Sequence, residues 1–110
     1  MSLADKRCVP CKGGVPALKR EEITPYLEQL DDWQLSDNAS RIRREFIFPD
    51  FNTALMFVNH VGHLAEAMGH HPEILFGWGH ATVEIWTHKI GGLHENDFIL
   101  AAQIDRLPEV

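Results

Sequence analysis

The residues in this sequence that are best suited to chemistry are histidines gathered around one proline. His70 and His71 are adjacent and are followed at once by Pro72, and Glu66 lies four residues before His70. A further histidine, His88, follows after a stretch rich in apolar residues. Histidine is the only side chain whose unperturbed pKa, ~6.5, makes both an acid and a base available near neutral pH. This group of side chains therefore predicts either proton-transfer catalysis or a metal site.

The two chemistries make different demands on spacing. Three histidines with Glu66 as a ligand or base would satisfy a catalytic zinc or a non-haem iron. Metal sites built on helices usually carry histidines at i and i+4, however, whereas adjacent histidines in a tight turn tend to diverge. The spacing of His70 and His71 therefore favours acid–base catalysis, and a metal-dependent histidine-site enzyme stays as the alternative.

Composition and charge exclude several classes of function. The chain has 110 residues, of which 45% are hydrophobic, so we expect one globular domain with one core. A net charge of -6 argues against a nucleic-acid-binding surface, which needs a concentrated positive footprint. No apolar run approaches the ~20 residues that span a membrane, and the first residues lack the apolar core of a signal peptide.

The first 16 residues contain two prolines, two glycines and no hydrophobic periodicity. They are predicted to form a flexible N-terminal lead, residues 1–16, before a domain of residues 17–110. The lead holds both cysteines, Cys8 and Cys11, in a C-x-x-C spacing with no second pair to complete a zinc site. We therefore expect free thiols that are dispensable for activity, and a reducing, cytoplasmic location.

The periodicity of the apolar residues predicts an α+β fold. Helical spacing recurs in three segments, and period-two alternation with intervening turn residues recurs in two. The predicted elements are a helix at 19–30, strands at 33–35 and 42–48, a helix at 51–68, strands at 74–78 and 81–88, and a helix at 95–107. Hairpins alternating with helices imply an antiparallel sheet covered on one side.

These elements place the histidines at the ends of secondary structure. Asp50 suits the N-cap of helix 51–68 and Gly69 suits its C-terminal stop, so His70 and His71 fall on a tight exit from that helix. Much of this helix is expected to be buried, because two apolar stripes together cover a wide face.

The second hairpin and the last helix carry the other candidates. Gly79 and His80 suit a two-residue hairpin turn, and the strand that follows ends at His88. Asp97, early in the last helix, is predicted to cap that helix, since acidic residues favour this place.

The spacing of the candidates resembles that of a known family. They match the signature of the pterin-4a-carbinolamine dehydratases in the pattern Glu66-x3-His70-His71-Pro72-x5-Trp78-x9-His88-x8-Asp97. The resemblance covers roughly residues 19 to 107 and includes Trp33, Phe48-Pro49-Asp50-Phe51 and Gly92-Leu93. It implies a four-stranded antiparallel sheet with three helices on one face. It also implies a homodimer or homotetramer joined through sheet edges, which would protect exposed strands.

The resemblance implies a hydro-lyase, 4a-hydroxytetrahydrobiopterin dehydratase. Its substrate is the 4a-hydroxytetrahydropterin that aromatic amino acid hydroxylases release, and elimination of water gives quinonoid dihydropterin in tetrahydrobiopterin recycling and biosynthesis. No cofactor and no metal is implied, since histidine acids and bases are suited to both proton transfers. The implied partners are the pterin, further copies of the chain and, functionally, such a hydroxylase, with no nucleic acid and no membrane.

The resemblance also implies the roles of individual residues. His70, His71, His88 and Glu66 are expected to be catalytic, with His70 and His88 moving protons and His71 chiefly contacting substrate. Glu66 would reach His70 or bind the amino-pyrimidine edge of the pterin. Trp78 offers a flat apolar surface, so we expect it to join His71 and Glu66 in substrate binding.

Two positions depart from the family pattern. Gly69 stands where Asp is common, and His94 stands where Ser or Thr would cap the last helix. Because histidine is a poorer N-cap, the start of that helix is expected to fray. Two other functions would keep the fold: action on another pterin, in molybdenum-cofactor metabolism, and a non-enzymatic role as a dimerisation partner, which family members in animals have for a homeodomain transcription factor.

Overall fold

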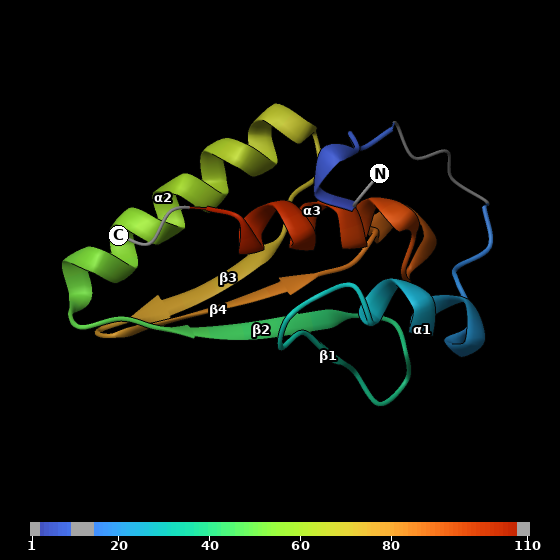
Figure 1. Cartoon of the computed structure of the whole chain (residues 1–110), viewed down its shortest axis with the longest axis horizontal. Coiled ribbons are helices and arrows are strands. Elements are labelled where there is room, and N and C mark those ends of the chain that lie inside the picture. The colour runs from blue at the N-terminus through green and yellow to red at the C-terminus, as the bar shows by residue number, and fades with distance from the viewer. Residues whose placement is uncertain (1–2, 10–14, 108–110) are drawn as a thin grey trace.

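A computed structural model describes residues 3–9 and 15–107, and its architecture confirms the predicted α+β fold (Figure 1). Two helices cross over one face of a four-stranded sheet, and the third lies beside them (Figure 1). The elements in chain order are α1 Arg20–Leu27, β1 Gln34–Leu35, β2 Ile42–Ile47, α2 Phe51–Met68, β3 Glu73–Gly77, β4 His80–Ile85 and α3 Glu95–Asp105, with short 3₁₀ helices η1 Leu3–Asp5 and η2 His88–Ile90.

The sheet is antiparallel throughout, in the order β1-β2-β4-β3. Alternate residues point to opposite faces, so Ile42 on β2 and its partner Ile85 on β4 lie fully buried under the helices. The other face carries polar residues and two exposed apolar ones, Ile47 and Leu75. The outer edge of β3 pairs with no other strand in the described part of the chain.

Helix α2 begins and ends where its capping residues predict. The Asp50 carboxylate accepts a hydrogen bond from the Thr53 backbone N–H at 2.8 Å, and Gly69 takes the left-handed conformation, φ 67°, that ends the helix. Its burial is narrower than predicted, because the sheet and α3 cover only one stripe. Phe51 is 46% exposed and Met56 is exposed as well.

The second hairpin differs from the prediction in its turn and in its last residues. β3 ends at Gly77 and β4 starts at His80, so the turn is Trp78-Gly79, and Gly79 has the positive φ of 80°. β4 ends at Ile85, and His88 belongs to η2 instead of the strand. The strand stops because the backbone of Thr87 bonds Gly92 across the η2 loop, not a residue of β2.

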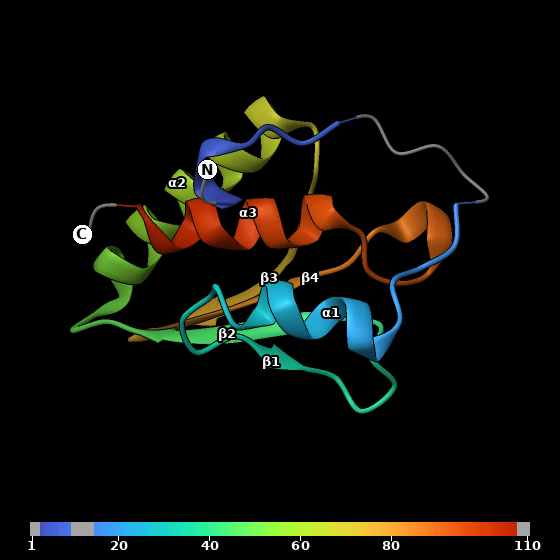
Figure 2. The same ribbon diagram turned by 45° about the vertical axis from the view of Figure 1, so that its right-hand side comes forward.

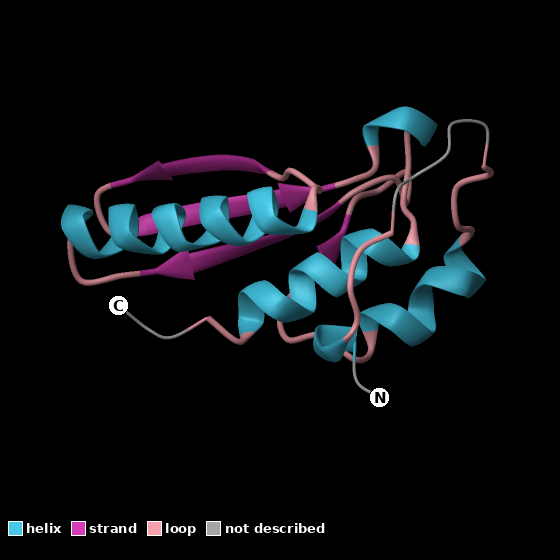
Figure 3. Cartoon of the chain, turned by 90° about the horizontal axis from the view of Figure 1, so that it is seen from above, coloured by secondary structure: helices cyan, strands magenta, loops and turns pink. Residues whose placement is uncertain are grey.

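Helix α3 is the centre of the core. Tyr26 of α1 stacks on its Phe98 with ring centroids 5.0 Å apart. Seen from above, the long helix α2 lies over the sheet, and α3 lies beside it (Figure 3). The expectation of a frayed start is wrong, because the His94 ring nitrogen Nδ1 accepts from the Asn96 backbone N–H at 3.1 Å. The Asp97 carboxylate accepts in turn from the His94 backbone N–H at 2.8 Å, which completes a capping box.

The N-terminal residues are more ordered than their composition suggests. Leu3–Asp5 form η1, which lies against α3, and Leu3 is buried in the core cluster (Figure 2). Cys8 is half-buried and its thiol is free, while Cys11 lies outside the described residues. The predicted division at residues 16 and 17 stays a prediction. Among the described residues, no helix is long and apolar enough to cross a membrane.

Candidate functional site

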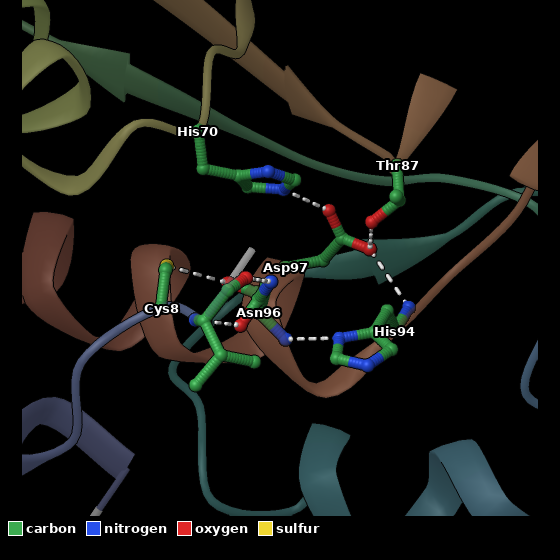
Figure 4. Close-up of polar contacts among 7 residues, drawn as sticks. Cys8, His70, Thr87, His94, Asn96 and Asp97 are labelled. Carbon is green, nitrogen blue, oxygen red and sulfur yellow. Dashed lines mark hydrogen bonds and ion pairs between the residues drawn. The ribbon is translucent and has the colours of Figure 1, made fainter. Parts of the chain in front are cut away.

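The centre of the candidate site is a contact between the exit of α2 and the first turn of α3. His70 follows the Gly69 cap and turns its ring toward Asp97, with Nε2 2.5 Å from Oδ1 (Figure 4). The Asp97 side chain is fully buried and that of His70 is almost so. An ionised carboxylate only accepts hydrogen bonds, so Nε2 carries the hydrogen and Nδ1 is the ring nitrogen left for a ligand.

Asp97 holds its own position through two further hydrogen bonds. Its Oδ2 accepts from the Thr87 hydroxyl and from the His94 backbone N–H, each at 2.8 Å (Figure 4). A buried carboxylate is costly unless it is well satisfied, and here three donors surround it. Because Thr87 follows β4 and His94 precedes α3, the carboxylate joins three separate segments and fixes the ring of His70 among them.

The neighbouring histidine, His71, is also paired with a carboxylate, but this pair is exposed to solvent. His71 Nε2 lies 2.8 Å from Glu66 Oε1, but the two side chains are 63% and 80% exposed. We expected Glu66 to reach His70 or to bind the amino-pyrimidine edge of the pterin. The structure pairs it with His71 and not with His70, and binding to the pterin stays a prediction. The αL turn at Gly69 reverses the chain, so His70 points inward and His71 stays over the end of α2.

His88 approaches the same region from the η2 turn. Its ring lies on that of Trp86, with centroids 4.3 Å apart and an interplanar angle of 30°. The Arg41 guanidinium in turn lies 3.9 Å from the centroid of the Trp86 ring. Stacking on a ring that itself holds a cation limits the orientations open to the His88 imidazole.

These segments enclose a cavity of about 460 Å³, which is within the size range of small-molecule sites. The three candidate histidines are gathered on it with a stretch of the N-terminal segment. Its lining residues are Cys8, Val9, Met68, Gly69, His70, His71, Thr87, His88, Lys89 and Asn96.

The structure brings together some of the predicted site residues and not others. His70, His71 and His88 line the cavity, and Glu66 reaches it through His71. Trp78 lies 70% exposed in the turn after β3, at the far end of the strand. Five residues of strand place it about 16 Å from the site, so it does not line this cavity within one chain.

Three contributors to the site were missed by sequence reasoning. Asp97 was expected only to cap α3, Thr87 fell within the predicted strand 81–88 without a role of its own, and Cys8 was placed in a flexible lead. The acidic residue of a capping box was the one usable signal, since a carboxylate fixed at a helix N-terminus can also accept from a second group. The contacts of Thr87 and Cys8 depend on packing.

The thiol in the cavity wall is in an environment that keeps it protonated. Burial, and to a smaller extent the nearby charge of Asp97, raises the pKa of Cys8 from 9.0 to about 11. At neutral pH the group is therefore a neutral, weakly polar side chain and not a nucleophile. Within residues 3–9 and 15–107, no three side chains of the His, Cys, Asp or Glu type are grouped to hold a metal ion.

Comparison with known proteins identifies a family. The family model for pterin 4 alpha carbinolamine dehydratase matches residues 16–107. A curated relative from Azoarcus sp. (strain BH72), named "Putative pterin-4-alpha-carbinolamine dehydratase", is 55% identical over 105 residues, which are 96% of this chain and 90% of the relative.

Two solved structures resemble the fold. One is a transcriptional coactivator/pterin dehydratase from Brucella melitensis, with a TM-score of 0.76 and 34% identity, covering 81% of this chain and 95% of that one. The other is a pterin dehydratase-like protein described as a RuBisCO assembly factor in the alpha-carboxysome. It has a TM-score of 0.59 and 21% identity, covers 68% of this chain and 87% of that one, and shows likeness of fold alone.

Proposed function

Because the chain belongs to the pterin-4a-carbinolamine dehydratase family, we propose that it eliminates water from 4a-hydroxytetrahydrobiopterin to give quinonoid dihydropterin. The observation that carries the proposal is the His70–Asp97 pair in the wall of a cavity that His71 and His88 also line. The cavity volume of about 460 Å³ leaves room for a bicyclic ring with a short side chain.

The reaction needs two proton transfers and no change of oxidation state. A base takes a proton from a ring nitrogen, and the electron pair of that bond forms the new double bond to the carbon that carries the hydroxyl. The carbon–oxygen bond breaks, and an acid protonates the departing hydroxide so that it leaves as water. Each transfer by a positioned side chain contributes about 10²–10⁴-fold to the rate.

The roles of the histidines follow from their settings. His70 has Nδ1 free, a ring fixed by Asp97 and little exposure, which suits the group that exchanges a proton with the substrate. His88, held by stacking on Trp86, is placed to serve as the second proton-transfer group. His71 and Glu66 lie exposed at the mouth, where they would contact polar groups of the pterin.

The proposal is tested by turnover of synthetic carbinolamine with chelator present. We expect activity in metal-free protein, a fall in kcat of about 10²–10⁴-fold for His70→Ala, and a larger fall when His88 is also replaced. His71→Ala should act mainly on KM. His63→Ala is the matched control, since His63 is exposed on α2 away from the cavity.

Three results would contradict the proposal. One is loss of activity with chelator and recovery with added zinc or iron, which would favour the metal-dependent alternative. Another is full rate in both the His70 and the His88 variants, with wild-type circular dichroism. The third is no turnover of any 4a-hydroxytetrahydropterin, whatever its side chain, which would favour a binding role over an enzyme.

We also propose that the active protein is a homodimer or homotetramer and that its substrate comes from an aromatic amino acid hydroxylase. Support comes from the unpaired outer edge of β3 and from the exposed apolar side chains Leu75, Phe51 and Met56. Light scattering at micromolar concentration should give a mass well above the 12.5 kDa of one chain. A monomer across that range would contradict the assembly.

A further inference from the structure

The N-terminal segment Leu3–Val9, here called the strap, lies outside the residues that the family model matches. In the structure it runs along α3, from η1 toward the cavity (Figure 2). Two of its residues, Cys8 and Val9, line that cavity with the candidate histidines. The strap is therefore in contact with the site although it is remote from it in sequence.

The far end of the strap is anchored by one apolar side chain and by polar contacts to α3. Leu3 is only 3% exposed within the core cluster. The Gln103 side-chain amide donates to the backbone carbonyls of Ala4 and Lys6, at 3.3 and 2.7 Å. Lys6 Nζ lies 2.7 Å from Glu95 Oε2. Together these contacts fix the direction of the strap along the helix.

The near end is clamped by one buried amide. Asn96 Nδ2 donates to the Val9 carbonyl at 2.6 Å, and the Val9 backbone N–H donates to Asn96 Oδ1 at 3.0 Å (Figure 4). The Asn96 side chain thus pairs with the backbone as a neighbouring strand would, and the residue is 2% exposed. Asn96 is adjacent to Asp97, so the strap is held in fixed register with the carboxylate that orients His70.

The clamp also fixes where Cys8 lies. The Cys8 thiol lies 3.6 Å from the Asn96 carbonyl, and Figure 4 shows it on the side of α3 that faces His70. The thiol is neutral at working pH, so it offers a weakly polar surface instead of a reactive one. Val9, with an exposed side chain beside it, forms the apolar rim of the opening.

We propose that the strap is a wall of the pterin pocket, that Asn96 positions it, and that Cys8 and Val9 contact the bound ring system. The inference rests on the proposed function, because the ligand it names is the pterin. It replaces the expectation that Cys8 and the segment Leu3–Val9 are dispensable, and the same expectation for Cys11 stays a prediction. A wall that contacts ground state and transition state alike contributes to KM and leaves kcat nearly unchanged.

The first test is protection of Cys8 from a thiol reagent, measured in Cys11→Ser protein so that Cys8 is the only thiol. The ligand is a stable dihydropterin without the 4a-hydroxyl, whose binding is followed separately by calorimetry. At 100 times Kd only about 1% of the pockets are empty, so labelling should slow by at least about tenfold. The same protein without ligand sets the reference rate.

The outcomes of this test separate the two proposals. Binding with protection supports the wall. Binding at an unchanged labelling rate overturns the wall and leaves the proposed function standing. Absence of any binding by a dihydropterin overturns the proposed function and, with it, the identity of the ligand at this wall.

The second test uses the split between KM and kcat. Asn96→Ala removes both bonds to Val9, and we expect KM to rise at least about tenfold, since the loss of one net hydrogen bond can already give that fold-change, with kcat within about twofold. Asn52→Ala on α2 is the matched control. Val9→Pro removes the strap's N–H and also replaces the Val9 side chain, while it leaves α3 unaltered, so it should raise KM as well. An unchanged KM in both strap variants would overturn the proposal.

Discussion

Two adjacent histidines at the end of α2 are each paired with a carboxylate, and the two pairs can be compared directly. His70 pairs with Asp97 between segments distant in sequence, and both side chains lie inside the protein. His71 pairs with Glu66 at nearly the same distance, and both lie in solvent. The two pairs share chemistry and backbone neighbours, and they differ in burial and in the number of other groups that hold the carboxylate.

The difference shows that distance alone does not decide what such a pair contributes. An exposed ion pair typically contributes about 0–1 kcal/mol, because water and salt screen it and two side chains must be ordered. Removing one partner of a buried pair typically costs about 3–5 kcal/mol, because the groups that remain lose their partners. Asp97 has three donors to leave unpaired, whereas Glu66 has one.

The largest expected effect is that of Asp97→Ala. The change leaves the Thr87 hydroxyl, the His94 backbone N–H and His70 without their acceptor. We expect the free energy of unfolding to fall by about 3–5 kcal/mol, measured by urea denaturation, and turnover to fall at least about 100-fold. A loss no larger than that of Glu66→Ala would show that burial does not distinguish the two pairs.

A smaller effect is expected at the turn that both pairs share. Gly69 has a φ of 67°, and an added Cβ would meet no atom within 4 Å, so only backbone strain opposes a side chain there. Gly69→Ala should lower stability by about 1 kcal/mol, and Gly69→Asn by less, because Asn tolerates the left-handed conformation. Equal stability of the Ala variant and the wild type, by thermal melting, would contradict the strain.

The pKa of the Cys8 thiol depends on the charge of Asp97, in the buried pair, and not on that of Glu66. In Cys11→Ser protein the alkylation rate should keep rising with pH toward a pKa of about 11. Asp97→Asn should lower that pKa by only part of its rise, since burial is the larger cause, and Glu66→Gln should leave it unchanged. The raised pKa also stabilises the folded state below pH 9.0, and this contribution is lost as pH rises through about 11.

The smallest expected effect is that of Glu66→Gln. We expect a loss of stability within about 0.5 kcal/mol at low salt and none at 1 M salt, where the Debye length is about 3 Å. The same salt series on Asp97→Ala should leave its loss nearly unchanged, because the buried site excludes ions. Chemical denaturation with urea, which adds no ionic strength, measures both. A loss at Glu66 that persists in salt would place that pair in the same class as the buried one.

Sequence reasoning was most successful where local rules decide the structure. Periodicity predicted the order of helices and strands, and capping chemistry predicted both ends of α2. The exit after Gly69 therefore placed His70 and His71 correctly at the end of a helix. Local rules did not indicate which way each side chain would point, because the αL turn sends one inward and leaves one outside.

The contacts that the sequence did not predict have one cause in common. Asp97 meets His70 across 27 positions of sequence, and Asn96 meets Val9 across 87, so neither contact has a local pattern. The strap has no periodicity of its own, because backbone bonds to side chains of α3 hold it rather than a stripe of apolar residues. Trp78 fits the family spacing, but strand β3 carries it away from the cavity.

The contact between the strap and α3 determines when the pocket can fold as the chain is synthesised. The strap is made well before its partners, since Asn96 follows Val9 by 87 positions and Gln103 follows Lys6 by 97. In a nascent chain Leu3 and Cys8 therefore lack their partners on α3 until that helix has been made. The sheet can pair while the chain is growing, but the pocket wall closes only once α3 has left the ribosome. A chain that ends before residue 95 would contain the site histidines but would lack α3, so the site could not form.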